Sequence, residues 1–152
     1  MPFMIAAVGR SRPGPERALY EHYLSRLREP VLLREVEEKK PLPVPDRMAR
    51  EGRLLLSCVP TGSKVVVLDE RGRMQSSRDF ASALERWLGE GTSTISFLIG
   101  GADGHDPAVR DRADLLLGFG SMTWPHMLVR GMLAEQLYRA RCIMDGHPYH
   151  RD

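Results

Sequence analysis

Short, largely apolar segments that alternate with helix-patterned segments constrain the fold of this chain more than any other feature. The unbroken run Val65–Leu68 is typical of a strand that is covered on both faces. The predicted strands are Phe3–Val8, Val31–Val36, Val65–Asp69, Ile95–Ile99 and Leu115–Phe119. Strands that alternate with helices predict an α/β domain with a mostly parallel sheet, whose ligand site lies outside the carboxyl ends of the central strands.

Helices are expected between these strands, and capping residues place several of their ends. Asp46 is a predicted N-cap, Ser76 begins a capping-box-like pattern with Asp79, and the run Pro41–Pro45 is predicted to be a loop. Trp87 is expected in the core. Helical spacing predicts helices from the 13–15 turn to about Leu27, from Asp46 to about Cys58, from Ser76 to about Leu88, briefly from Asp106-Pro107, and from near Pro125 to before Gly146.

The length suits a single domain that spans residues 1–152, because a chain of this size buries about two thirds of the surface that its unfolded form exposes. Cys58 and Cys142 lie among apolar neighbours, which favours packed free thiols in a reducing compartment. Residues 1–8 are too short and too uncharged for a signal peptide, and no stretch reaches the length of a membrane span. These features predict a soluble, cytoplasmic protein that is not inserted in a membrane.

Positive charge comes almost entirely from arginine, since Lys39, Lys40 and Lys64 are the only lysines. The arginine fork suits phosphate, although a GC-rich genome also replaces lysine with arginine. With a net charge of +2, the balance of charge leaves nucleic-acid binding open.

Three segments are expected at the carboxyl edge of the sheet: Leu68-Asp69, Gly100–Gly104 and Phe119–Trp124. The glycines have the spacing GGxxG, which is neither a dinucleotide fingerprint nor a P-loop, so taken alone they favour a tight turn that needs positive φ. The third segment combines a glycine, two hydroxyls and two aromatic rings, which fits a flat ligand such as adenine; packing between elements is the alternative.

The terminal histidines raise the question of a metal. His147 and His150 would need partners such as His105, Asp103 or Asp106 to form a zinc site, but no CxxC pair or HExxH helix is present and Pro148 interrupts helical spacing. We therefore expect no metal, and a solvated tail is the simpler interpretation.

Taken together, several motifs resemble the SPOUT-class family of large-subunit rRNA methyltransferases that act on N3 of a pseudouridine. The resemblance covers the full length and is carried by Phe97–Gly101, Thr123–His126, Arg130, Glu135–Ala140 and the ending Pro148-Tyr149-His150. It implies an α/β sheet with a C-terminal trefoil knot, a homodimer, and S-adenosylmethionine as methyl donor. The donor-binding residues that it implies are Leu68, Gly100, Phe119, Gly120, Ser121, Met122, Thr123 and Trp124.

The reaction that the resemblance implies is methylation of a pseudouridine of 23S rRNA, with the assembled ribosome as substrate. N3 is a weak acid, so we expect Arg130 to stabilise the anion, His150 or His126 to accept the proton, and Tyr149 to stack on the extruded base. Candidate phosphate contacts are the arginines at positions 10, 12, 130, 139, 141 and 151.

Other functions remain open from the sequence. A SPOUT enzyme that methylates tRNA ribose would share the donor site, whereas a ribosome-binding factor without activity would need none; a zinc hydrolase would hold stoichiometric metal. The residues Ala102-Asp103 and Trp124 depart from what is usual in the family. Neither the general base nor the protomer that supplies the tail is determined by the sequence.

Overall fold

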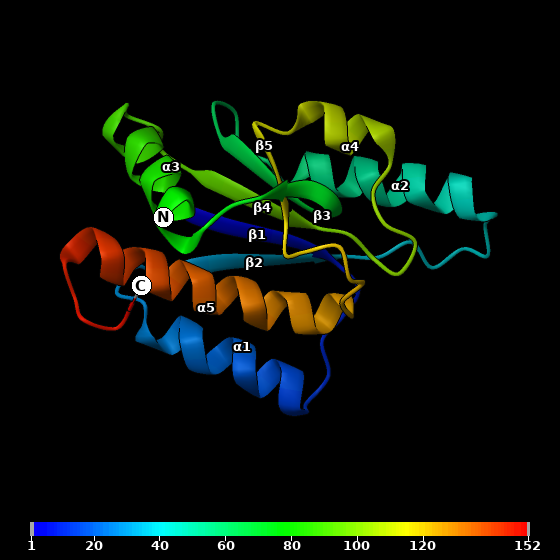
Figure 1. Cartoon of the computed structure of the whole chain (residues 1–152). Helices are drawn as coiled ribbons and strands as arrows, with labels where there is room; N and C mark the ends of the chain where they lie inside the picture. The colour runs from blue at the N-terminus through cyan, green and yellow to red at the C-terminus, as the bar shows by residue number, and fades with distance from the viewer. Residues whose placement is uncertain (1, 152) are drawn as a thin grey trace.

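The computed structural model describes residues 2–151 and contains one five-stranded parallel sheet (Figure 1). The sheet order is β2-β1-β4-β3-β5, and each neighbouring pair is parallel. The strands are β1 (Phe3–Val8), β2 (Val31–Val36), β3 (Lys64–Met74), β4 (Ile95–Ile99) and β5 (Leu115–Gly118). The predicted α/β class with a parallel sheet is confirmed.

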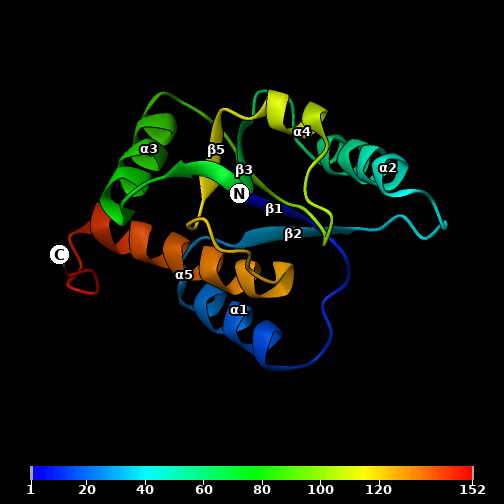
Figure 2. The ribbon, with the colours of Figure 1, turned by 45° about the vertical axis from the view of Figure 1, so that its right-hand side comes forward.

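Helices cover both faces of the sheet. They are α1 (Pro15–Arg26), α2 (Val44–Ser57), α3 (Ser77–Gly89), α4 (Pro107–Arg112) and α5 (His126–Asp145). The helices α1, α3 and α5 lie on one face, and α2 and α4 lie on the other (Figures 1 and 2). Alternate residues of β1 enter the two cores: Phe3 and Ile5 pack on the α1, α3 and α5 side, while Met4 and Ala6 pack with Leu55 of α2.

Most helix ends follow the predicted caps. The Ser76 hydroxyl accepts a hydrogen bond from Asp79 N at 3.0 Å, the Asp106 carboxylate accepts one from Ala108 N at 3.1 Å, and Gly146 ends α5 with φ 72°. The start of α2 differs from the prediction. The helix begins at Val44, so the end of the proline run is helical and Asp46 lies in the first turn rather than at the N-cap. The N–H groups of the first helical turn have no partner within the helix, so Pro45, which has no N–H, is tolerated there.

The strand β3 extends to Met74, beyond the predicted end at Asp69. Its register on β5 shifts, so that Leu68 and Arg73 both pair with Leu117. The sequence did not predict the extension because its residues are mostly polar. They are little buried near the edge of the sheet, so they need no apolar pattern. The extension matters for the site because it carries the chain past the carboxyl end of β4.

Predictions about buried residues hold. Trp87 is 6% exposed, Cys142 is buried, Cys58 is half-buried, and both cysteines are free. Between residues 2 and 151, none of the helices combines the length and apolar character needed to cross a bilayer.

Candidate functional site

A cavity of about 730 Å³ opens where β3, β4 and β5 present their carboxyl ends. It lies between the two segments that the sequence singled out, 100–104 and 119–124. Seven of the eight predicted donor-binding residues line it: Leu68, Gly100, Phe119, Gly120, Met122, Thr123 and Trp124. Ser121, the eighth, is exposed and does not contribute to the wall. Parallel strands bring these distant segments to one edge, as expected for a sheet of this class.

The glycine loop forms a narrow cradle after β4. A side chain at Gly100 would place its Cβ 3.2 Å from the Gly104 carbonyl and from the His105 ring, and Gly104 itself has φ +83°. A hydrogen bond from Gly104 N to Gly101 O at 3.1 Å closes the turn. The glycines are therefore needed for the turn itself, and the backbone that they leave bare faces the cavity.

The segment 119–124 folds back on itself to form the opposite wall. The Trp124 indole Nε1 donates to the Phe119 carbonyl at 3.2 Å, and the Thr123 hydroxyl donates to the Glu70 carboxylate at 2.9 Å. Met122 and Trp124 remain 72% and 40% exposed. Exposed apolar side chains at the mouth of a cavity are typical of a surface that receives a flat ligand or a base.

Among the titratable residues of the wall that were not predicted to bind the ligand, His105 and Asp69 have buried side chains. His105 is 3% exposed, its Nε2 lies 3.0 Å from the Leu68 carbonyl, and burial lowers its pKa. Asp69 is also buried and accepts a hydrogen bond from Arg110 Nε at 2.8 Å. The sequence signal was their place directly after strand or loop segments of the carboxyl edge, since Asp69 follows Leu68 and His105 follows Gly104.

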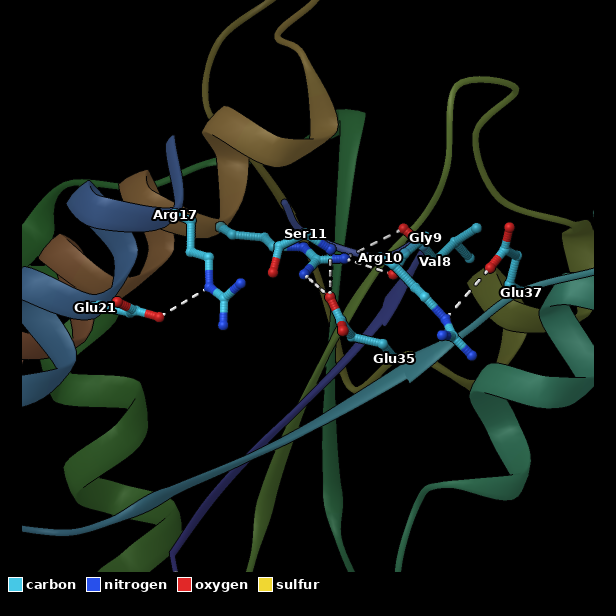
Figure 3. Close-up of polar contacts among 9 residues, drawn as sticks. Val8, Gly9, Arg10, Ser11, Arg17, Glu21, Glu35 and Glu37 are labelled. Carbon is cyan, nitrogen blue, oxygen red and sulfur yellow. Dashed lines mark hydrogen bonds and ion pairs between the residues drawn. The ribbon is translucent and has the colours of Figure 1, made fainter. Parts of the chain in front are cut away.

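Arg130 does not reach the cavity, contrary to the expectation that it stabilises the substrate directly. Its side chain is 2% exposed and is paired with the Glu35 carboxylate. It also donates to the carbonyls of Gly9 at 3.0 Å and Val8 at 3.4 Å. Figure 3 shows the Glu35 carboxylate turned toward the loop after β1, where Ser11 N donates to it at 2.8 Å. Arg130 therefore joins β1, β2 and α5.

His126 lies one helical turn before Arg130 and does line the cavity. It packs against the loop after β1, because a Cβ at Gly9 would lie 3.4 Å from its Cε1. Burial, followed by the positive charge of Arg130, lowers the pKa of His126, while the backbone of Val8 acts in the opposite direction. The ring is therefore neutral at physiological pH.

The tail residues pack on α5 at a distance from the cavity. The rings of Tyr149 and Tyr138 meet edge to face at 4.7 Å, the Tyr149 hydroxyl donates to Glu135 at 3.3 Å, and Arg139 donates to His150 Nδ1 at 3.0 Å. Glu135 and Arg139 lie nine and thirteen residues after His126, which is about 13 and 20 Å along the helix. The predicted site residues Tyr149 and His150 are thus not brought together with this cavity within one protomer.

The remaining sequence candidates divide by their partners. Arg139 is paired with Glu135 and Arg141 with Glu29, so these two arginines, like Arg130, are already committed within the chain. Arg10 is exposed beside Glu37, and the arginines at 12 and 151 are exposed as well. Among residues 2–151, the histidines, cysteines and carboxylates form no group of three that could hold a metal ion.

Comparisons with known proteins identify the family. Residues 1–150 match the family described as "Predicted SPOUT methyltransferase". The chain is 59% identical over 151 residues to ribosomal RNA large subunit methyltransferase H of Paramagnetospirillum magneticum and 55% identical over 151 residues to that of Rhodospirillum rubrum, with 99% of each chain covered in both cases. It is 49% identical over 160 residues to that of Paracoccus denitrificans, with both chains covered completely. The chain belongs to the SPOUT methyltransferase family and, within it, to the ribosomal RNA large subunit methyltransferases H.

Proposed function

We propose that this protein transfers the methyl group of S-adenosylmethionine to N3 of a pseudouridine in 23S rRNA, with the assembled ribosome as substrate. The observation that carries the proposal is the cavity at the carboxyl ends of β3, β4 and β5, which both glycine-containing loops enclose. Its volume lies within the range of about 300–1,000 Å³ that is typical of small-molecule sites. The full-length similarity to rRNA methyltransferases supports the choice of substrate class. Such a substrate places the protein in the cytoplasm.

The cavity fits the methyl donor in shape and chemistry. The turn leaves no room for a side chain at Gly100, so backbone forms the cavity wall there, and Phe119 and Trp124 supply apolar walls for a flat ring. When bound, S-adenosylmethionine supplies an activated methyl group and its own leaving group. The protein is left with positioning the acceptor nitrogen, excluding water and removing the N3 proton.

His126 is the better of the two predicted proton acceptors. Its ring lines the cavity and is neutral at physiological pH, so its free nitrogen lone pair can accept a proton. His150 is held by Arg139 on a distant part of α5. Arg130 takes a different role from the one expected: it ties α5 to Gly9 and Glu35, and it thereby fixes the helix end that carries His126. It is a positioning residue.

We further infer a homodimer in which the tail of one protomer completes the cavity of the other, because Tyr149 and His150 do not approach the cavity of their own chain. An apolar groove of about 610 Å³ between α1, α3 and α5 is the candidate contact surface. Phe119 and Gly120 line this groove as well as the cavity, so a partner seated there would border the donor site. The exposed side chain of Met74 also lines the groove.

Subunit mixing tests this arrangement. Pure homodimers of His126→Asn or of Tyr149→Ala are expected to be inactive. A mixed dimer would contain one intact composite site and would recover up to about half of the wild-type activity per dimer. If mixing restores no activity although mixed dimers form, each protomer uses its own tail and the shared site is refuted.

The trefoil knot that the family implies is part of the same proposal. After β4 the chain crosses to one face as α4, adds β5 beyond β3, and then returns to the opposite face as α5 beside α1 (Figure 2). A return of this kind is consistent with a threaded C-terminal segment.

The decisive experiment supplies the purified protein with labelled donor and with ribosomes from a strain that lacks the modification. We expect one methyl group, which mass spectrometry locates on N3 of a pseudouridine in 23S rRNA. Free 23S rRNA and bulk tRNA serve as controls. A methyl group on a ribose or on tRNA would refute the proposed substrate, and binding to ribosomes without any transfer would instead support a ribosome-binding factor.

A further inference from the structure

One buried carboxylate at the mouth of the cavity holds two arginines. The Asp69 side chain is 4% exposed; its Oδ2 accepts a hydrogen bond from Arg110 Nε at 2.8 Å. Its Oδ1 accepts one from the backbone N of Arg71 at 2.8 Å and lies 3.9 Å from Arg71 Nε. Arg71 belongs to the extension of β3 and Arg110 to α4. Asp69 therefore holds the Arg110 guanidinium by a hydrogen bond and the Arg71 backbone by another, and it keeps the Arg71 guanidinium within ion-pair distance beside the same opening.

Within the contacts that Asp69 makes, guanidinium groups outnumber carboxylates. Two guanidinium groups share one carboxylate, and the Nε contact of Arg110 leaves the four other N–H donors of its fork outside the pair. Of the two other acidic residues at the opening, Asp103 lies 3.9 Å from Arg47, whereas Glu70 accepts a hydrogen bond from the neutral Thr123 hydroxyl and keeps its negative charge. The arginine side chains are 28% and 66% exposed at positions 110 and 71, so both are accessible to a ligand.

These features fit an oxyanion site that is prepared before the ligand arrives. Holding an arginine by a buried carboxylate reduces the side-chain entropy that binding must overcome, and the fork matches phosphate oxygens. A nucleotide that is extruded into the cavity carries its own phosphates to the mouth. We propose that Arg71 and Arg110, held by Asp69, bind a backbone phosphate of the RNA substrate next to the target nucleotide. The proposal rests on the proposed function, because it requires an RNA substrate.

Salt dependence tests the site, with Arg71→Ala as the main variant because Arg71 is the more exposed arginine. Ribosome binding is measured by co-sedimentation between about 50 and 200 mM salt. Loss of one phosphate contact should make the slope of log K against log salt shallower by about 0.7–0.9 and weaken binding severalfold at low salt. Arg71→Lys should retain the slope. The dissociation constant for S-adenosylmethionine, measured by calorimetry, should not change.

Matched variants separate the alternatives. Arg53→Ala removes an exposed arginine from α2, and we expect it to leave the slope unchanged. Arg110→Lys keeps the charge that Asp69 requires but loses the fork, so it should raise the KM for ribosomes without lowering the melting temperature much. An unchanged slope for Arg71→Ala, or an equal change for Arg53→Ala, would overturn the site.

Other outcomes assign the oxyanion differently. Weaker binding of the methyl donor to Arg71→Ala would mean that the arginines hold the donor carboxylate. A lower kcat with an unchanged KM and slope would mean that they act on the target nucleobase. Either result overturns the phosphate site. Failure of the proposed function is distinguishable, because the wild-type protein would then fail to methylate ribosomes while the binding series with Arg71→Ala still reports on the site.

Discussion

Replacing Glu35 with glutamine tests whether the buried ion pair holds the cavity end of α5 in place. The substitution keeps the size of the side chain and one oxygen acceptor, but it removes the negative charge opposite Arg130. Arg130 is 2% exposed and would keep only neutral partners, namely the Val8 and Gly9 carbonyls and the new amide. The positive charge would then be buried without a counter-ion.

The expected cost follows from the burial of the two partners. Removing one member of a fully buried pair costs about 3–5 kcal/mol, and a hydrogen bond to a charged group contributes about 1.5–3 kcal/mol. Because the Glu35 side chain is 27% exposed, water screens part of the loss, and we expect about 2 kcal/mol. For a chain of this length, that free energy lowers the melting temperature by about 4–8 °C.

The pH dependence of this difference has a definite sign. Burial raises the pKa of Glu35, but the hydrogen bond from Arg130 and the Ser11 N–H outweigh it and hold the pKa below its ordinary value of 4.5. A carboxyl whose pKa is lowered by folding stabilises the protein above its ordinary pKa, and this contribution is lost as the pH falls through the folded value. The gap between the wild type and Glu35→Gln should therefore be full at pH 7 and shrink below about pH 4.5.

Urea denaturation measures the difference in unfolding free energy between the wild type and Glu35→Gln. Urea is uncharged and does not screen ion pairs, and a fixed protein concentration keeps the contribution of any oligomer comparable. The control is Glu37→Gln, the same substitution two residues along the chain, where the carboxylate is 42% exposed and 3.7 Å from an exposed arginine. Such a pair contributes about 0–1 kcal/mol. A loss below about 0.5 kcal/mol for Glu35→Gln, an equal loss for the control, or a gap that persists at pH 3 would refute the reasoning.

Three further predictions follow from the geometry. In Gly72→Ala the new Cβ would lie 2.5 Å from the Leu117 carbonyl carbon, so we expect urea denaturation to show a loss of at least about 2 kcal/mol in unfolding free energy. The control is Gly89→Ala at the last residue of α3, where nothing lies within 4 Å of the new Cβ. This substitution should be neutral or stabilising by up to about 1 kcal/mol. His126→Asn should lower kcat by about 10²–10⁴-fold. In the wild type, kcat should fall as the pH drops below the His126 pKa, which lies below 6.5, and the variant should lose this fall. A variant whose kcat still falls at acidic pH would show that another group is the base. Donor binding should change the fluorescence of Trp124 at the cavity, so that Trp124→Phe removes the change and Trp87→Phe keeps it; the reverse result would place the donor elsewhere.

The layered fold was predictable because the signals that define it are local. The run Val65–Leu68 is apolar since both of its faces are covered, and Ser76 and Asp106 cap helices through hydrogen bonds that span only two or three residues. Prediction from the sequence failed where residues of a strand are exposed, because such residues need not alternate between apolar and polar. The polar extension of β3 to Met74 pairs with β5, yet its residues read as a connection because a strand near the edge of a sheet has no need of alternating burial.

The place of the cavity was also predictable, because parallel strands force the segments after β3, β4 and β5 to one edge whatever their detailed conformation. The burial and the partners of Arg130 were not. Its position four residues after His126 correctly indicates that both lie on one side of α5, but Arg130, Gly131, Leu133 and Ala134 are all buried, so no polar stripe shows which side faces the cavity. Arg130 forms its ion pair with Glu35, which is 95 residues away in the sequence, and only the order of the strands brings the two side chains together.

Two carboxylates, Glu35 and Asp69, each hold arginines in place, but only Asp69 lines the cavity. A flexible cation contributes little to binding or orientation unless its position is fixed before the substrate arrives. Glu35 fixes Arg130, which is sealed from water and can only orient its neighbours, whereas Asp69 fixes Arg71 and Arg110, which remain accessible. The exposure of the arginine, rather than its charge, therefore separates a positioning role from a role in contact with the substrate. If Glu35 sets the geometry of His126 and Asp69 supports the proposed phosphate contact, substitutions of the two carboxylates should change kcat and KM independently.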